Sequence, residues 1–172
     1  MKCPQCETEH ELLEPAFRRP DEVFRLPRED RASRVDEDDD LCRMRVSLDS
    51  EVPAVYRYFL RTVLPVRIPD VDDFTQWGIW VETTELDMFR VRELWSDPRQ
   101  ALEPPFQAKI ANAIPGYPST LNLPVFVQLN DPSTRAAAYF SAQLEHPFAH
   151  ECRAGVTVPR VVEWLRSIGV EC

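Results

Sequence analysis

The chain has 172 residues, of which 20 are basic and 29 acidic, so its net charge is −9. Hydrophobic residues make up 44% and charged residues 28%, values typical of a globular protein. The negative charge disfavours nucleic acid as a partner, and no apolar run approaches the roughly 18 residues that cross a bilayer. Since the first twenty residues show no signal peptide, we expect a cytoplasmic protein that forms a single domain over residues 1–172.

The chain begins with a pattern typical of a zinc site. Cys3 and Cys6 are two residues apart, and His10 follows four residues later. Structural zinc is held by four ligands, commonly thiolates and imidazoles. These three residues therefore predict a zinc-knuckle-like turn over residues 1–10, with Cys42 as the best candidate for the fourth ligand. Two alternatives remain: an exposed or redox-active thiol pair at the terminus, and a Cys42 that is an ordinary core thiol.

The next segments predict irregular structure. Residues 11–27 carry three prolines and read as a connector, followed by a short helix over residues 28–34. The five adjacent carboxylates at 36–40 predict a solvated loop, because a calcium loop would space its ligands alternately.

Alternation of apolar and polar residues then predicts several strands. In the strand over residues 74–83 we expect Trp77, Ile79 and Val81 on one face and Trp80 on the other. Gly78 lies on the face of Trp80, where we expect it beneath a bulky ring or at a bulge. Pro65 and Pro69 bracket an extension that we expect at a sheet edge. Residues 106–114 fit either a strand or a helix. The expected strands cover residues 41–48, 54–64, 74–83, 121–129 and 136–144.

Helices are expected between and after these strands. Thr84 and Asp87 have the spacing of a capping box, which predicts a helix that ends near Ser96. Two more helices are expected around residues 147–153 and from Thr157 onward. Few helices among hairpin-like strands indicate an α+β fold, with a mostly antiparallel sheet and flanking helices over residues 41–172.

The aromatic residues of these elements are expected in the core. This expectation covers Trp77, Trp80, Trp95, Tyr56 and Tyr58. We expect Tyr117, on the rigid turn of residues 115–118, to pack against the body rather than to contact a partner.

Two histidines offer a candidate catalytic site. His146 and His150 are four residues apart, a spacing that on a helix can hold a hydrolytic metal ion. However, Pro147 stands where such a site has its glutamate, and it favours His146 as a helix cap. Cys152 lies close in sequence to both histidines, but that proximity is weak support for a Cys–His pair.

The chain resembles a bacterial family known only as a domain of unknown function. The resemblance covers nearly the whole chain and implies a protein without an assigned activity. It also ties Cys42 to Cys3, Cys6 and His10 as one set of four zinc ligands, and it includes His146 but not His150. Its motifs are Cys3/Cys6/His10, Asp40-Leu41-Cys42, Trp77-Gly78-Ile79-Trp80-Val81, Pro115 to Leu123, and His146-Pro147-Phe148-Ala149.

From these observations we expect a zinc-stabilised protein-interaction module. Its negative charge fits a basic partner protein, as for an immunity or antitoxin-like factor, and we assign no catalytic residue. The alternative is a small metal-independent hydrolase, or an enzyme that binds a small ligand, using His146 near the turn at 115–122. A pocket with His146, Tyr117 and a carboxylate would favour the enzyme. A flat acidic face with exposed aromatic residues would favour the binder.

Overall fold

Seven strands form one sheet within residues 14–47, 49 and 53–169, the part of the chain that the computed structural model describes. Each strand pairs antiparallel with the next along the chain, and β3 and β7 pair in parallel. The expected α+β fold with a mostly antiparallel sheet is confirmed. The strands are β1 (Val35–Glu37), β2 (Leu41–Arg45), β3 (Tyr56–Ile68), β4 (Asp73–Thr83), β5 (Phe106–Ile110), β6 (Pro124–Gln128) and β7 (Ala137–Tyr139).

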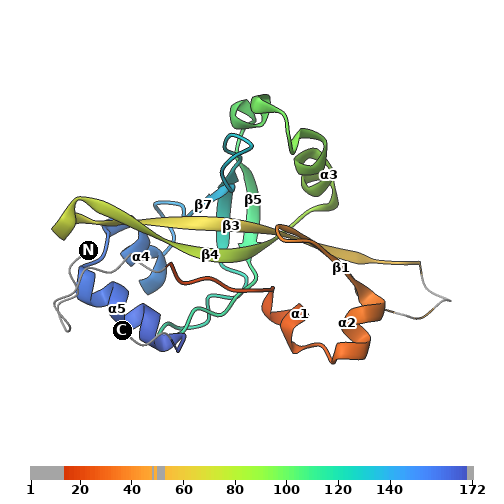
Figure 1. The fold of residues 1–172 in the computed structure, drawn as a ribbon, viewed down its shortest axis with the longest axis horizontal. Coiled ribbons are helices and arrows are strands. Elements are labelled where there is room, and N and C mark those ends of the chain that lie inside the picture. Colours follow the sequence, from red (N-terminus) through yellow and green to blue (C-terminus); the bar gives the residue numbers. More distant parts are fainter. Residues whose placement is uncertain (1–13, 48, 50–52, 170–172) are drawn as a thin grey trace.

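Strand β3 is long enough to have two partners on one edge. Its first part, from Tyr56 to Leu60, pairs with β2, and Val63 pairs further along with Ala137 of β7. The N–H of Val63 donates to the carbonyl of Ala136 over 2.9 Å. Because β4, β5 and β6 connect β3 to β7 in order, this pairing closes the strands β3 to β7 into a barrel (Figure 1).

Five helices and two 3-10 turns surround the barrel in the described part of the chain. In Figure 1, α1 and α2 lie on one side of the sheet, α3 stands on the other side, and α4 and α5 lie together toward the far end of β3 and β4. The capping box at the start of α3 is confirmed, since Thr84 Oγ1 accepts from the N–H of Asp87 over 3.1 Å. The helices are α1 (Asp21–Arg25), α2 (Arg28–Arg34), α3 (Glu85–Leu94), α4 (Pro147–Ala154) and α5 (Val158–Ser167), with η1 (Pro69–Val71) and η2 (Pro98–Leu102).

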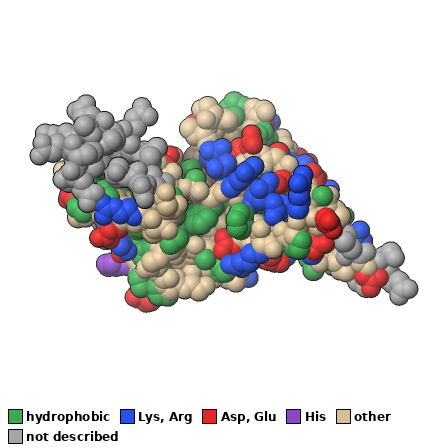
Figure 2. All heavy atoms as spheres, turned by 60° about the horizontal axis from the view of Figure 1, so that its bottom comes forward, with side chains coloured by type: hydrophobic (Ala, Val, Ile, Leu, Met, Phe, Trp, Pro, Cys, Tyr) green, Lys and Arg blue, Asp and Glu red, His purple; other side chains and the backbone are tan. Residues whose placement is uncertain are grey.

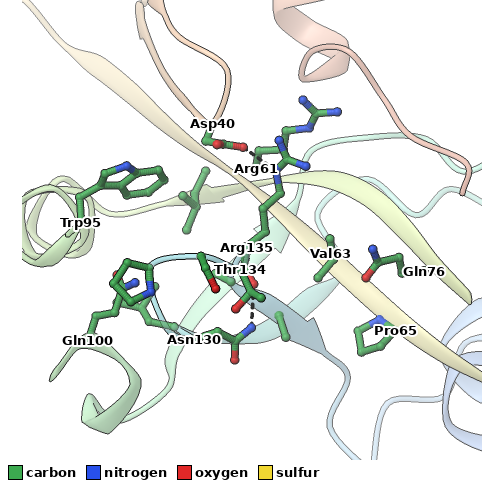
Figure 3. Close-up of a pocket in the computed structure, with 16 residues that line it drawn as sticks. Asp40, Arg61, Val63, Pro65, Gln76, Trp95, Gln100, Asn130, Thr134 and Arg135 are labelled. Carbon is green, nitrogen blue, oxygen red and sulfur yellow. Dashed lines mark hydrogen bonds and ion pairs between the residues drawn. The ribbon is translucent and has the colours of Figure 1, made fainter. Parts of the chain in front are cut away.

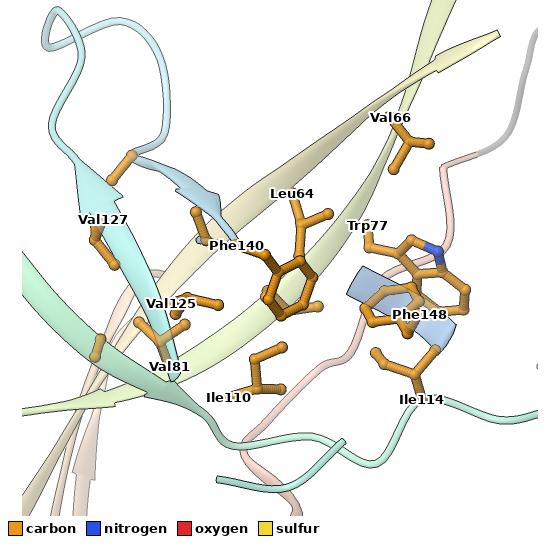
Figure 4. Packing of buried hydrophobic residues seen from close by; sticks show 14 of the residues in the cluster. Leu64, Val66, Trp77, Val81, Ile110, Ile114, Val125, Val127, Phe140 and Phe148 are labelled. Atoms are coloured by element: carbon orange, nitrogen blue, oxygen red, sulfur yellow. The ribbon is translucent and has the colours of Figure 1, made fainter. Parts of the chain in front are cut away.

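One hydrophobic core fills the barrel and continues under α4 and α5 (Figure 4). Trp77 of β4 is fully buried, and its ring meets Phe148 of α4 and Trp164 of α5 edge-on, at centroid distances of 6.3 and 5.5 Å. Phe140, after β7, meets Phe148 in the same way at 5.8 Å. These aromatic contacts hold the two C-terminal helices against the barrel.

A second, smaller core lies on the other face of the sheet. The alternation of β4 places Trp77, Ile79 and Val81 in the main core and Trp80 in the second one, as the sequence predicts. The second core is covered by Val23 of α1. Its buried members are Val23, Cys42, Met44, Phe59, Trp80 and Ala111.

Gly78 lies against a neighbouring backbone, not beneath a ring or at a bulge as expected. Ala16 forms an isolated parallel bridge with it. The N–H of Gly78 donates to the carbonyl of Pro15, and the N–H of Phe17 donates to the carbonyl of Gly78, both over 2.8 Å. A Cβ on residue 78 would lie only 2.8 Å from the Cβ of Ala16, so the bridge depends on a glycine here.

Other expectations need correction. The carboxylate run at 36–40 is not wholly a solvated loop, because Asp36 and Glu37 belong to β1. Each has a basic partner, Arg43 for Asp36 and Arg19 for Glu37. The connector at 11–27 contains α1, and the strand expected at 136–144 is confined to Ala137–Tyr139.

Candidate functional site

Cys42 is the predicted zinc ligand that falls within the described residues. It lies on β2 with only 2% of its surface exposed, among the apolar side chains of the second core. Burial, reinforced by the nearby carboxylate of Glu37, raises the pKa of its thiol to about 12. These surroundings support the core-thiol alternative.

The other predicted ligands, Cys3, Cys6 and His10, lie outside the described residues. Their convergence on Cys42 therefore stays a prediction. Among the residues that the structure does describe, no group of three or more histidine, cysteine or acidic side chains could hold a metal ion.

The helix α4 places the predicted histidines in structural roles. The Nδ1 atom of His146 accepts from the N–H of Phe148 over 3.2 Å, which confirms His146 as the N-cap of this helix. Its Nε2 atom is buried and has no partner among the described residues. His150 is exposed, and burial raises the pKa of the Cys152 thiol well above its usual range. A protonated thiol is a poor nucleophile, so a Cys–His pair gains no support.

Tyr117 packs against the body of the protein, as expected. Its hydroxyl donates to Glu151 over 2.5 Å and accepts from the indole N–H of Trp164 over 2.7 Å. Glu151 in turn accepts from Arg160 over 3.0 Å, and the Arg160 guanidinium lies 5.2 Å from the centre of the Tyr117 ring, within reach of a cation–π contact. Burial and Glu151 raise the pKa of the tyrosine. Tyr117 and the neighbouring carboxylate of Glu151 are thus bonded to each other, and His146 is not part of this network.

A polar junction forms where β3 changes partner from β2 to β7. The N–H of Arg61 donates to the carbonyl of Asp40, at the start of β2, over 2.8 Å. Arg135, just before β7, donates from Nε to the carboxylate of Asp40 over 2.6 Å. This ion pair joins residues that are 95 positions apart in the chain, and it holds the ends of β2 and β7 together on one edge of β3.

The junction opens into a cavity of about 660 Å³ (Figure 3). That volume lies within the range of small-molecule sites. Arg61 and Asp40 lie at one end, Trp95 forms one side, and Asn130 and Thr134 come from the turn between β6 and β7. The sequence analysis missed this cavity, because its residues come from segments that are far apart in the chain.

A second hollow, of about 430 Å³, lies on the other side of Trp95. Its lining is acidic: Asp38, Asp39 and Asp40 from the β1–β2 turn face Arg92 and Trp95 at the end of α3. The carboxylate of Asp38 accepts from the N–H of Leu41 over 2.7 Å, which fixes the turn. Contrary to expectation, Trp95 is not a core residue, since 42% of its surface is exposed.

The segment 84–103, which we call the α3 lobe, exposes apolar side chains beside this hollow. Met88 and Val91 on its inner side are buried in the main core. On its outer side Leu86, Phe89 and Leu102 are exposed by 78%, 54% and 83%. The lobe stands away from the barrel in Figure 1. An amphipathic helix normally exposes its polar side, so this second apolar side is unusual.

The charge of the protein is unevenly spread. Figure 2 shows a band of Lys and Arg side chains across one face, with acidic residues around it. Because the chain as a whole has a net charge of −9, the rest of the protein is strongly negative. Within the described residues, no helix is long and apolar enough to span a membrane.

These features describe a small α+β protein with a β-barrel, a polar cavity and an exposed apolar lobe. A family described as an uncharacterized protein conserved in bacteria, DUF2199, matches residues 2–156. The chain therefore belongs to this family, as the resemblance implied. No curated protein and no solved structure matches it.

Proposed function

We propose that this protein works by binding another protein, through the outer side of the α3 lobe and the acidic hollow beside it. The observation that carries the proposal is the exposure of Leu86 and Phe89 on α3, the helix whose last turn brings Arg92 to a hollow lined by carboxylates. Clustered apolar groups rimmed by charge are typical of protein-binding surfaces.

The charges of the hollow define the partner. Asp38 and Asp39 line it together with Asp40, and Arg92 is the basic residue that lines it in the described part of the chain. Asp40 is already paired with Arg135, which leaves the other two carboxylates to meet a cation. We therefore propose a basic partner that presents an apolar side chain to the lobe and a Lys or Arg to the hollow.

The alternative enzyme has less support. His146 caps α4 through Nδ1, and the hydroxyl of Tyr117 is bonded to Glu151 and Trp164. A general base needs a free atom within hydrogen-bond reach of its substrate. The Nε2 atom of His146 has no partner among the described residues but is buried, and the Tyr117 hydroxyl is already engaged, so neither offers such an atom to a substrate.

Selection from a displayed library of random peptides on the intact protein tests the proposal. Enriched peptides should combine Lys or Arg with an aromatic or aliphatic residue, and their binding should weaken as salt is raised. Phe89→Ser should weaken binding about tenfold or more, as for a buried interface anchor. Phe74→Ser is the matched control, because Phe74 is equally exposed, by 62%, but lies outside the lobe. Peptides without basic residues, or equal binding to both variants, would refute the proposal.

We further propose, from the sequence, that a structural zinc ion stabilises the N-terminal segment through Cys3, Cys6 and His10. Metal analysis of the purified protein should find about one zinc per chain, lost in Cys3→Ser. Cys42→Ala then separates the two alternatives for that residue. Loss of zinc would make it the fourth ligand, and full retention would make it a core thiol.

A further inference from the structure

We propose that the cavity at the β3 junction binds a small organic anion, in which a carboxylate or phosphate is attached to a flat ring. The cavity shares Asp40 and Trp95 with the acidic hollow but is lined by different arginines, and the proposal does not depend on the protein-binding function. Two arginines would hold the anionic group, and Trp95 would lie against the ring.

The cationic end of the cavity consists of Arg61 and Arg135. A guanidinium carries five N–H donors, arranged to grip a carboxylate or a phosphate with two at once. Arg135 uses its Nε for the carboxylate of Asp40. Arg61 makes a long bond from Nη1 to the carbonyl of Asp39 over 3.4 Å, and its Nη2 donates to no described residue. Donor capacity is therefore left over at this end.

The charge balance of the lining favours an anion. Among the described residues that line the cavity, Arg61 and Arg135 contribute two positive charges and Asp40 one negative charge, which leaves an excess of one positive charge. This local sign is opposite to that of the whole protein, whose net charge is −9. A positively charged cavity in a negatively charged protein is typical of a site for an anionic ligand.

Trp95 gives the cavity a flat apolar wall. Its ring stands opposite the β3 side of the cavity, where Val63 and Pro65 lie (Figure 3). An exposed indole that lines the same cavity as two arginines suits an aromatic or heteroaromatic ring, which gains stacking as well as burial. Asn130 and Thr134 on the turn before β7 add polar groups at the floor. The cavity of about 660 Å³ holds a molecule the size of a nucleoside monophosphate.

Titration calorimetry with defined probes tests this proposal. The anionic probes are adenosine 5′-monophosphate, phenyl phosphate and benzoate, and their neutral analogues are adenosine and benzamide. At least one anion should bind about tenfold or more tightly than its neutral analogue. Whether phosphates or benzoate bind best then distinguishes the two anionic groups. Equal binding of anions and analogues, or no binding of any probe at millimolar concentration, would overturn the proposal.

Variants locate the binding. Arg61→Gln and Arg135→Gln should each weaken the anion about tenfold, whereas Arg67→Gln should not, because Arg67 lies on the same strand but pairs with Asp72 outside the cavity. Phe89→Ser, which removes the proposed protein anchor, should leave anion binding unchanged. A failure of the protein-binding proposal can therefore be distinguished from a failure of the anion-binding proposal.

Quenching of tryptophan fluorescence gives a second readout without any ligand. Three of the four tryptophans are at most 2% exposed, so quenchers in solution report mainly on Trp95. The ratio of quenching by iodide to quenching by neutral acrylamide should fall about twofold in Arg61→Gln and Arg135→Gln, and stay constant in Arg67→Gln. An unchanged ratio in all three folded variants would show that the arginines create no anion-attracting field at Trp95.

Discussion

Replacing Gly78 with alanine tests whether the N-terminal segment is held to β4 by close backbone contact. The new Cβ would lie 2.8 Å from the Cβ of Ala16, whereas carbon atoms pack best at about 3.5–4.0 Å. The backbones must therefore separate by up to about 1 Å, or the two bonds of Gly78 must lengthen. Overpacking of this kind lowers the free energy of unfolding by about 1–3 kcal/mol. Alanine also reduces the conformational entropy of the unfolded chain, which offsets about 0.4–1 kcal/mol of that loss. We expect a net loss of about 1–2 kcal/mol.

A double-mutant cycle isolates this contact. In an Ala16→Gly background the nearest remaining atom is the Cα of residue 16, at 3.4 Å, which a small shift accommodates. Gly78→Ala should then be almost neutral, so the coupling between the two positions should be about 1–2 kcal/mol. Urea unfolding of the four proteins measures it, and hydrogen exchange at the amides of Phe17 and Gly78 shows whether the segment has detached. An equal loss in both backgrounds would refute the reasoning.

Three further changes test the burial and hydrogen bonds described above. Cys42→Ala should cost about 1 kcal/mol at pH 7 in urea unfolding. Because the thiol pKa is raised to about 12 in the native state, wild-type stability should fall as pH rises from about 9 toward 12, and the alanine variant should lose less over that range. Tyr117→Phe should cost about 1–3 kcal/mol, since the buried indole N–H of Trp164 loses its acceptor; a loss below about 0.3 kcal/mol would contradict that bond. His146→Ala should cost about 1 kcal/mol in thermal unfolding, and His146→Asn should restore most of it, because asparagine also caps helices.

Local sequence signals predicted the elements that depend on neighbouring residues. The capping box of Thr84 and Asp87 begins α3 as expected, and the period of two along β4 assigned Trp77 and Trp80 to opposite faces. Both signals arise within a few residues, so no distant partner is needed to read them. By contrast α1 has five residues, too few for a helical period to be visible.

Features that depend on distant partners could not be predicted. Asp36 and Glu37 look solvated in the sequence, and it is Arg43 and Arg19 that draw them into a strand with ion pairs. Trp95 was expected in the core because large aromatic residues are usually buried. Trp95 directly follows the last residue of α3, and no local sequence pattern indicates that a side chain at this position is exposed.

The cavity lies at one of two places in the described sheet where a single strand edge has two successive partners. On β4 the edge next to β5 is continued by Ala16, and the absence of a side chain at Gly78 lets the two backbones meet closely. On β3 the edge passes from β2 to β7 within three residues, from Arg61 to Val63. At this change Arg61 of β3 and Arg135, which precedes β7, line the cavity instead of a third strand. The first junction is therefore filled by backbone contact, whereas the second stays open and charged, and only the second can admit a ligand.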